Sequence, residues 1–142
     1  MAKGWKFEDN SKEVKKRLAG VSEEAMEAAA LMIEAQAKAL APVDSGELRD
    51  KIDHVVKNVD SVVIGQVGSP LDYAIYQEFG TGERADNGAG RKGGWSYQDP
   101  SGEWFFTRGN EPQPFLRPAF RRNKKKIEEV IGGKYKSTFK GK

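Results

Sequence analysis

The sequence predicts an α+β fold, in which a long N-terminal helix and a C-terminal helix pack on a small antiparallel β-sheet, with a projecting β-hairpin and loop insertion. Apolar residues recur at helical spacing near both ends of the chain. Runs of β-branched residues lie between them, and a glycine-rich, aromatic stretch precedes the last helix. We expect one domain over 1–142, with an ordered core over 11–133, a loop and hairpin insertion over 82–110 and a flexible basic tail over 134–142.

The first element is predicted as a helix over Val21–Leu40, which is rich in alanine, the strongest helix former. Ser22 is placed to cap its start. Pro42 ends it, because the residue before a proline disfavours helix. The apolar stripe can be followed back to Val14, with Gly20 as a weak point.

Two strands are predicted next, over Leu48–Lys57 and Ser61–Val67, both rich in valine and isoleucine. The residues Asn58–Asp60 between them can turn the chain, so the strands should pair antiparallel. His54 lies in the first strand. Because no cysteine or second histidine is near it, we expect a surface residue and not a metal ligand.

A short helix is predicted over Leu71–Phe79, with Asp72 at its start and Gly80 as its C-terminal glycine. A mobile loop over Thr81–Gly94 and an aromatic hairpin over Trp95–Thr107 should follow. An isolated hairpin is marginally stable in water, so its aromatic side chains need a surface to contact. That surface is either another protein or the chain's own sheet.

The last helix should begin near Pro118, since proline suits the first turn of a helix. Apolar residues make one face of it, and arginine and lysine cover the other. The pair Gly132-Gly133 is expected to end the helix. The apolar face consists of Ala119, Phe120, Ile127, Val130 and Ile131.

The composition excludes several kinds of chemistry. The chain has no cysteine and one histidine, which removes disulfides, thiolate catalysis and cysteine–zinc sites. We predict no catalytic residue, no metal site and no cofactor: the acidic residues near Asp44 lack the spacing of a calcium loop, and the Gly-x-Gly-x-x-Gly pattern from Gly88 follows a loop instead of a strand. No apolar run approaches the roughly 18 residues of a membrane span, and no secretory signal is visible. We therefore expect an intracellular protein without a membrane partner.

Charge is distributed unevenly along the chain. The segment from Pro112 to Lys142 has ten basic and two acidic residues, whereas the rest has 14 basic and 19 acidic ones. Such an asymmetry can reflect nucleic-acid contact, head-to-tail packing of identical subunits, or lysines that are simply solvated.

Three sequence blocks, Ala41–Arg49, Tyr73–Thr81 and Gln113–Phe120, resemble in this order the tailed-bacteriophage minor tail component family, also described as neck, head–tail connector or tail-completion proteins. The resemblance implies a structural virion protein of a long-tailed phage or prophage, and not an enzyme. It would act in a ring-like homo-oligomer at the neck with other neck and tail proteins, after assembly in the host cytoplasm. The chain departs from the compact members in the long stretch Gly82–Asn110, and Ser45 stands where threonine is common.

Two sets of residues are therefore of interest. We expect the motif blocks to make the fold, and the aromatic arm and the basic helix to make contacts between subunits. DNA contact in the neck or packaging channel is the alternative function. The fold-motif set is Pro42, Asp44, Ser45, Gly46, Leu48, Tyr73, Tyr76, Phe79, Gly80, Pro114, Phe115, Leu116 and Pro118. The candidate interface set is Trp95, Tyr97, Trp104, Phe105, Arg117, Arg121, Arg122, Lys124 and Lys125.

Overall fold

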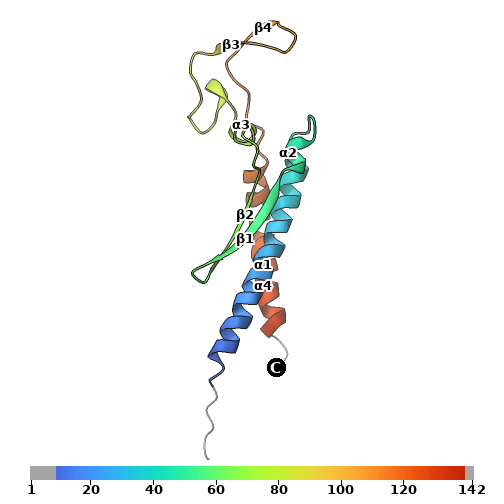
Figure 1. Ribbon diagram of the computed structural model, residues 1–142, viewed down its shortest axis with the longest axis vertical. Helices are drawn as coiled ribbons and strands as arrows, with labels where there is room; N and C mark the ends of the chain where they lie inside the picture. The colour runs from blue at the N-terminus through green and yellow to red at the C-terminus, as the bar shows by residue number, and fades with distance from the viewer. Residues whose placement is uncertain (1–8, 140–142) are drawn as a thin grey trace, which may run out of the picture.

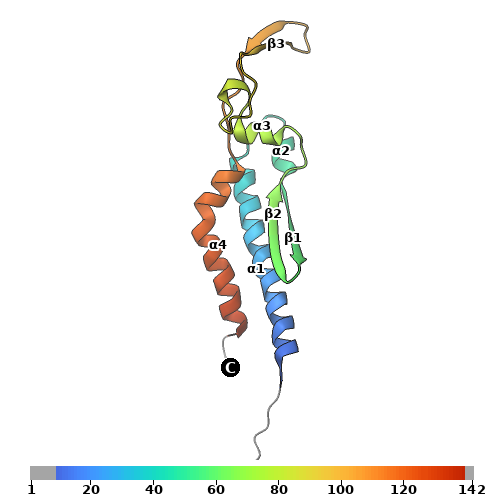
Figure 2. The ribbon, with the colours of Figure 1, turned by 90° about the vertical axis from the view of Figure 1, so that its left-hand side faces the viewer.

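The computed structural model describes residues 9–139 as an elongated α+β molecule, which confirms the predicted fold class (Figure 1). Two long helices, α1 (Ser11–Leu40) and α4 (Leu116–Phe139), run side by side. The hairpin of β1 (Asp53–Val59) and β2 (Val62–Gly68) packs on the other side of α1, so that α1 lies between the hairpin and α4 (Figure 2). The C-terminal helix therefore packs mainly on α1 and not directly on the sheet.

Helix α1 begins ten residues earlier than predicted and passes Gly20 without a break. The prediction that Ser22 caps its start is wrong, because this hydroxyl lies within the helix, donates to the carbonyl oxygen of Leu18 and meets the hydroxyl of Tyr135. Small side chains let two elements approach α1 closely. Its buried residues are Val21, Ala25, Ala29, Ala30, Glu34 and Ala37.

The predicted first strand is wrong in its first half, where Glu47–Asp50 forms the short helix α2 and buries Leu48. Strand β1 then pairs with β2 in the antiparallel register Val55↔Gln66 and Val59↔Val62. The turn comes later than predicted. Both of its residues have positive φ, at Asp60 (50°) and Ser61 (67°), as a tight two-residue hairpin turn requires.

One glycine fixes how closely the hairpin approaches α1. A Cβ placed on Gly65 of β2 would lie 2.8 Å from the sulfur of Met26 and 3.6 Å from the Cβ of Ala30. Real Cβ atoms rarely come so near a neighbour, so the absence of a side chain at Gly65 lets the strand pack directly on the helix.

Helix α3 (Ala74–Phe79) starts three residues later than predicted, and the residue that precedes it is Tyr73 and not Asp72. Gly80 ends it with φ of 80°, a conformation that favours glycine. The 3₁₀ helix η1 (Gly82–Arg84) follows within the predicted loop. Side-chain and backbone bonds hold this loop: the Glu83 carboxylate accepts the N–H of Gly93 at 2.9 Å.

The predicted aromatic hairpin is confirmed as β3 (Trp95–Gln98) and β4 (Trp104–Thr107), paired antiparallel. It projects from the end of the molecule beyond α3 (Figure 1). The carboxylate of Asp99 shapes its turn by accepting the N–H groups of Ser101 at 2.9 Å and Glu103 at 3.0 Å. We call the segment 82–110 the arm.

Helix α4 starts at Leu116, two residues before Pro118, and the prediction that Gly132-Gly133 ends it is wrong. Contacts with α1 support its last turns. The Arg17 guanidinium donates to the carbonyl oxygen of Thr138 at 3.1 Å and lies over the ring of Phe139. The first part of the predicted flexible tail is thus helical, and its last three residues, 140–142, lie outside the described part of the chain.

The core is small and lies where α2, α3 and the start of α4 meet the end of α1. Phe115 and Ile52 are its largest fully buried side chains, and alanines fill much of the remainder. Among residues 9–139, no helix is long and apolar enough to cross a membrane.

Candidate functional site

A buried carboxylate connects the second and third motif blocks. Glu78 on α3 is 3% exposed, and its oxygens accept the backbone N–H groups of Phe115 at 2.7 Å, Leu116 at 2.9 Å and Arg117 at 2.9 Å. These N–H groups belong to the start of α4, where a helix leaves its donors unpaired and favours negative charge. Glu78 therefore caps α4 from another element.

The guanidinium of Arg117 completes this arrangement. It donates to the Glu78 carboxylate at 2.9 Å, to the Glu78 carbonyl oxygen at 2.6 Å and to Asp86 at 3.0 Å, and it lies 4.5 Å from the ring centroid of Phe79. We call Glu78, Arg117 and Asp86 the latch. Arg117 was predicted as an interface residue, but its donors are used inside the molecule.

The latch also shifts a pKa. Burial alone would raise the pKa of Glu78, but the hydrogen bonds from Leu116, Phe115 and Arg117 outweigh burial and hold the pKa below its ordinary value. Glu78 lies within the second motif block, but it was not among the residues predicted to make the fold. The available signal was one acidic residue in an otherwise apolar and aromatic block, matched by one arginine in the third block.

The first motif block forms the turn from α1 into α2. Gly46 has φ of 84°, and the hydroxyl of Ser45 accepts the N–H of Glu47 at 3.3 Å. Leu48 is buried in the core, Pro42 is half-buried and Asp44 is exposed. In the third block, Phe115 is fully buried, Leu116 and Pro118 are half-buried, and Pro114 is exposed.

Two tyrosines of the second block contribute little to the core, although the motif blocks were expected to make the fold. Tyr73 and Tyr76 are exposed, the latter by 58%. With Ile75 of α3 and Trp95 of the arm, Tyr76 lines a largely apolar hollow of about 390 Å³ between α3 and the arm. We call it the α3 hollow.

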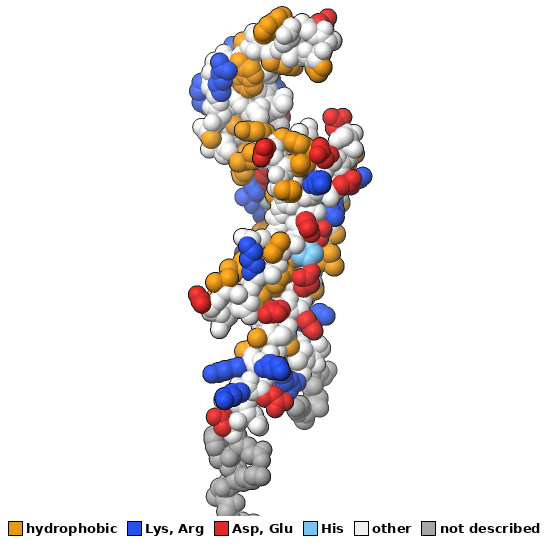
Figure 3. Space-filling model, in the orientation of Figure 1, with side chains coloured by type: hydrophobic (Ala, Val, Ile, Leu, Met, Phe, Trp, Pro, Cys, Tyr) orange, Lys and Arg blue, Asp and Glu red, His pale blue; other side chains and the backbone are white. Residues whose placement is uncertain are grey.

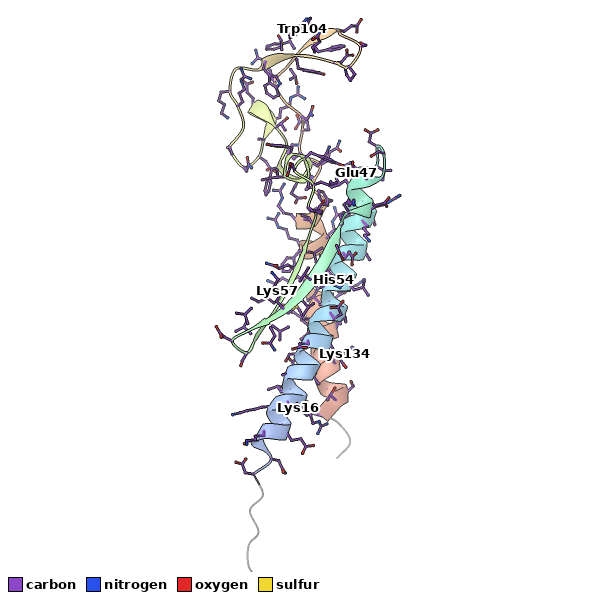
Figure 4. The ribbon with its side chains drawn as sticks, viewed as in Figure 1. Lys16, Glu47, His54, Lys57, Trp104 and Lys134 are labelled. Carbon is purple, nitrogen blue, oxygen red and sulfur yellow. The ribbon has the colours of Figure 1, made fainter. Side chains whose placement is uncertain are left out.

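The aromatic side chains of the arm are exposed at the end of the molecule opposite the last turn of α4 (Figures 3 and 4). Tyr97 and Phe105 stack on one face of the hairpin with ring centroids 5.7 Å apart. Trp104 and Phe106 on the other face are 69% and 62% exposed. The alternative that the arm folds back on the body sheet is wrong.

His54 is not the surface residue that the sequence predicted, because its side chain is only 13% exposed between two glutamates of α1. Its Nδ1 lies 2.5 Å from Glu34, and its Nε2 contacts Glu27. The hydrogen bonds with Glu27 and Glu34 outweigh burial and raise the pKa of His54. Burial would raise the pKa of Glu34, but bonds from Lys38 and His54 lower it.

These residues form an ion-pair cluster that attaches β1 to α1. Glu34, Asp53 and His54 also place one ligand atom each within 4.8 Å of one another, a spacing compatible with a cation. The hydrogen bonds from His54 and Lys38 to Glu34 already account for its buried carboxylate. His54 lies 20 positions from Glu34 and 27 positions from Glu27 in the sequence, so local spacing gave no signal for this cluster.

Positive charge gathers at two places. On α4, Arg121, Arg122, Lys124 and Lys125 are exposed and form no ion pair with any residue between 9 and 139. The first turns of α1 and the last turns of α4, which carry the labelled Lys16 and Lys134 in Figure 4, form a second basic region. We call it the basic end; it contains Lys12, Lys15, Lys16, Arg17, Lys134 and Lys136.

A small fold with a modest core and large apolar side chains on its surface is typical of a protein that assembles with others. The comparison with family models identifies which assembly. Residues 6–80 match the family described as "Bacteriophage HK97-gp10, putative tail-component", and the chain belongs to this family of phage tail components. The match spans the first two motif blocks, whereas the arm and the third block lie beyond it. The comparisons with curated proteins and with solved structures return no match.

Proposed function

We propose that this phage tail component acts at the neck of a long-tailed phage, where it completes the tail and joins it to the head as part of a ring of identical subunits. The observation that carries the proposal is the exposed outer face of the β1–β2 hairpin. Val55, Val59, Val62 and Ile64 are each at least 41% exposed there. Together with the exposed aromatic residues of the arm, they leave apolar surface in water that a contact with another subunit would bury.

The charge distribution supports contact between unlike patches of neighbouring subunits. The basic residues of α4 are exposed, while Glu23, Glu24 and Glu27 lie on α1 beside the hairpin. A contact between two different patches is heterologous, and it closes into a ring when the rotation between subunits divides the circle. The same surfaces would bind neighbouring neck and tail proteins.

A structural role places the protein in the virion, after assembly from subunits in the host cytoplasm. Binding energy would come from apolar burial. Complete burial of a valine or isoleucine contributes about 1.5–3 kcal/mol, and these half-exposed side chains would each contribute about half of that. Electrostatic complementarity between α4 and the acidic part of α1 would mainly fix orientation and accelerate encounter.

The test is a phage that lacks this gene. We expect unjoined heads and tails in the lysate, restored to joined particles by the wild-type protein supplied in trans. Gold-labelled antibody on the restored particles should mark the head–tail junction alone. Joined, infectious particles without the protein, or labelling spread evenly along the tail, contradict the proposal.

DNA contact is the second candidate, favoured by the basic end. Its six basic side chains come from the two helix termini and have one acidic neighbour in sequence, Glu13. Phosphate contacts release counterions, so the affinity for a duplex should fall steeply as salt is raised. Duplex binding with a slope of several counterions supports this candidate, and no binding at about 50 mM salt removes it.

A further inference from the structure

The α3 hollow is an apolar binding site at the base of the arm. Its walls are Ile75 and Tyr76 of α3, Ala85 and Ala89 of the loop, and Trp95 of β3. Its volume of about 390 Å³ lies within the range of about 300–1,000 Å³ that is common for ligand sites. Ile75 and Tyr76 are more than half exposed there, so the hollow leaves apolar surface in water.

The rim of the hollow is positively charged. The Arg91 guanidinium lies 5.6 Å from the ring centroid of Trp95, and Lys92 follows it on the exposed loop. Within the described residues, neither side chain forms an ion pair. Arg91 therefore places one cation in the lining of the hollow, next to its aromatic wall, and Lys92 adds a second cation one residue further along the chain.

The tip of the same arm has the opposite character. Trp104 and Phe106 point from one face of the hairpin and are its most exposed aromatic residues. Asp99 and Glu103 lie in the turn, and residues 93–107 contain no basic residue. The tip is an aromatic knob with two negative charges.

The tip does not reach the hollow of its own chain. Trp95, which lines the hollow, is the first residue of β3, whereas Trp104 pairs with Gln98 at the far end of that strand. Three residues of extended strand separate the two ends by about 10 Å. Trp104 also lies at the outer end of the arm in Figure 4. The occupant of the hollow must come from another molecule.

We propose that the occupant is the arm tip of a second copy of this chain, with Trp104 in the α3 hollow and Asp99 and Glu103 facing Arg91 and Lys92. The inference rests on the proposed self-assembly and names its contact. Charge complementarity favours a second copy. The knob and most of the hollow are also built by the same segment, 82–110, which lies outside the family match. A chain that carries the knob therefore carries the hollow as well, as contact between two copies requires.

This contact is heterologous, because each copy gives a tip and receives one. A buried tryptophan or phenylalanine covers about 150–250 Å². The knob alone thus gives a weak contact, below the roughly 1,200 Å² of a stable interface. Closure of a ring, in which every copy makes two such contacts, would stabilise it.

Cysteine pairs test the geometry, because the natural chain has no thiol. Ser101→Cys marks the tip and Ala89→Cys marks the rim of the hollow, each in a separate protein sample. We expect mixing under mild oxidation to give a tip–rim disulfide dimer at least about tenfold faster than a mixture of Ser101→Cys with Ser137→Cys, whose cysteine lies on exposed α4. The charge swap Arg91→Glu should abolish this advantage, and Glu103→Arg in the tip sample should restore it.

A photo-crosslinking amino acid at position 104 tests the same contact in assembled particles. The expected product joins residue 104 to a peptide from 75–95 of a second copy. Crosslinks to another protein, to DNA or between two tips overturn the inference when the tip–rim disulfide also forms no faster than its control. If that happens while the antibody still marks the head–tail junction, the contact is wrong and the neck function is supported. If the tip–rim disulfide forms but the protein is absent from phage particles, the neck function is wrong and the contact is supported.

Discussion

Removal of the Glu78 carboxylate should destabilise the body of the protein strongly, although Glu78 is a charged residue. In Glu78→Ala, the Phe115 N–H loses its acceptor in a fully buried position, at a cost of about 1–3 kcal/mol. Loss of the cap on α4 costs about 1 kcal/mol more. Arg117 retains Asp86 and some water, so its lost bond contributes at most about 1 kcal/mol. These contributions give an expected loss of about 2–5 kcal/mol, which overlaps the cost of breaking other buried pairs.

Urea denaturation followed by circular dichroism at 222 nm measures this loss, because the two long helices dominate that signal. In a parallel thermal scan the melting temperature should fall by about 6–20 °C, at about 3–4 °C per kcal/mol for a chain of this size. Glu128→Ala is the matched control: Glu128 is an exposed glutamate on α4, and its removal should change the free energy of unfolding by less than about 0.5 kcal/mol. Glu78→Gln keeps the shape of the side chain and one acceptor, so it should fall between the two.

The sign of the pH dependence gives a second reading of the same variant. Because the folded pKa of Glu78 is lowered, its stabilising contribution is present above the ordinary glutamate pKa and is lost as pH falls through the folded pKa. The stability gap between wild type and Glu78→Ala should therefore narrow only in acid. A loss below about 1 kcal/mol at neutral pH, or a gap that stays constant into acid, would refute the account of the latch.

Three further outcomes follow from the structure. The chain has one histidine, so the imidazole signals in its NMR spectra belong to His54. The pKa of His54 should lie above 6.5, so the stability that it contributes is full below pH 6.5 and is lost as pH rises through its folded pKa. A titration midpoint at or below 6.5 contradicts the ion-pair cluster. Gly82→Ala should destabilise the base of the arm by about 1–3 kcal/mol more than Gly88→Ala, as measured by native-state hydrogen exchange. Both glycines have positive φ, but only a Cβ on Gly82 would overlap the backbone of Arg108. Equal effects of the two substitutions would show that this overlap is relieved. Trp104→Ala should leave the free energy of unfolding within about 0.5 kcal/mol of wild type, because the ring is exposed. The same substitution should weaken self-association, measured by sedimentation velocity. A change in the free energy of unfolding without a change in self-association would show that the ring packs within its own chain.

Patterns within short segments predicted the elements that depend on short segments. The alanine-rich stripe located α1, and the valine-rich runs located the β1–β2 hairpin. Aromatic residues on both sides of a proline–glycine turn located the arm. Element boundaries were less predictable, since they depend on distant partners: α4 continues past Gly132-Gly133 because Tyr135 and Thr138 bind α1, and no property of the last 27 residues alone shows that.

Charged residues were the part that the sequence could not place. A lone histidine and scattered glutamates have the same spacing whether they are solvated or paired. Only the packing of β1 on α1 brings His54 between Glu27 and Glu34. Glu78 and Arg117 are 39 residues apart and meet across the whole arm. The candidate interface set accordingly lost Arg117. Trp95 is half-buried in the wall of the α3 hollow, and the other members are exposed, which is compatible with the predicted contacts.

The base of the arm explains how a long insertion fits this fold. Its two ends are joined by backbone bonds, from the N–H of Thr81 to the carbonyl oxygen of Asn110 at 3.0 Å and from Glu83 to Arg108 at 2.8 Å. Just outside them, the N–H of Gln113 donates to Gln77 at 2.7 Å. The chain thus leaves and re-enters the body at nearly one point, and the hydrogen bonds between Glu78 and the start of α4, which use no residue of the arm, hold α3 against α4. Segments anchored in this way can differ in length at little cost to the body. The arm can therefore contribute contacts for assembly without changing the way in which α3 packs against the start of α4.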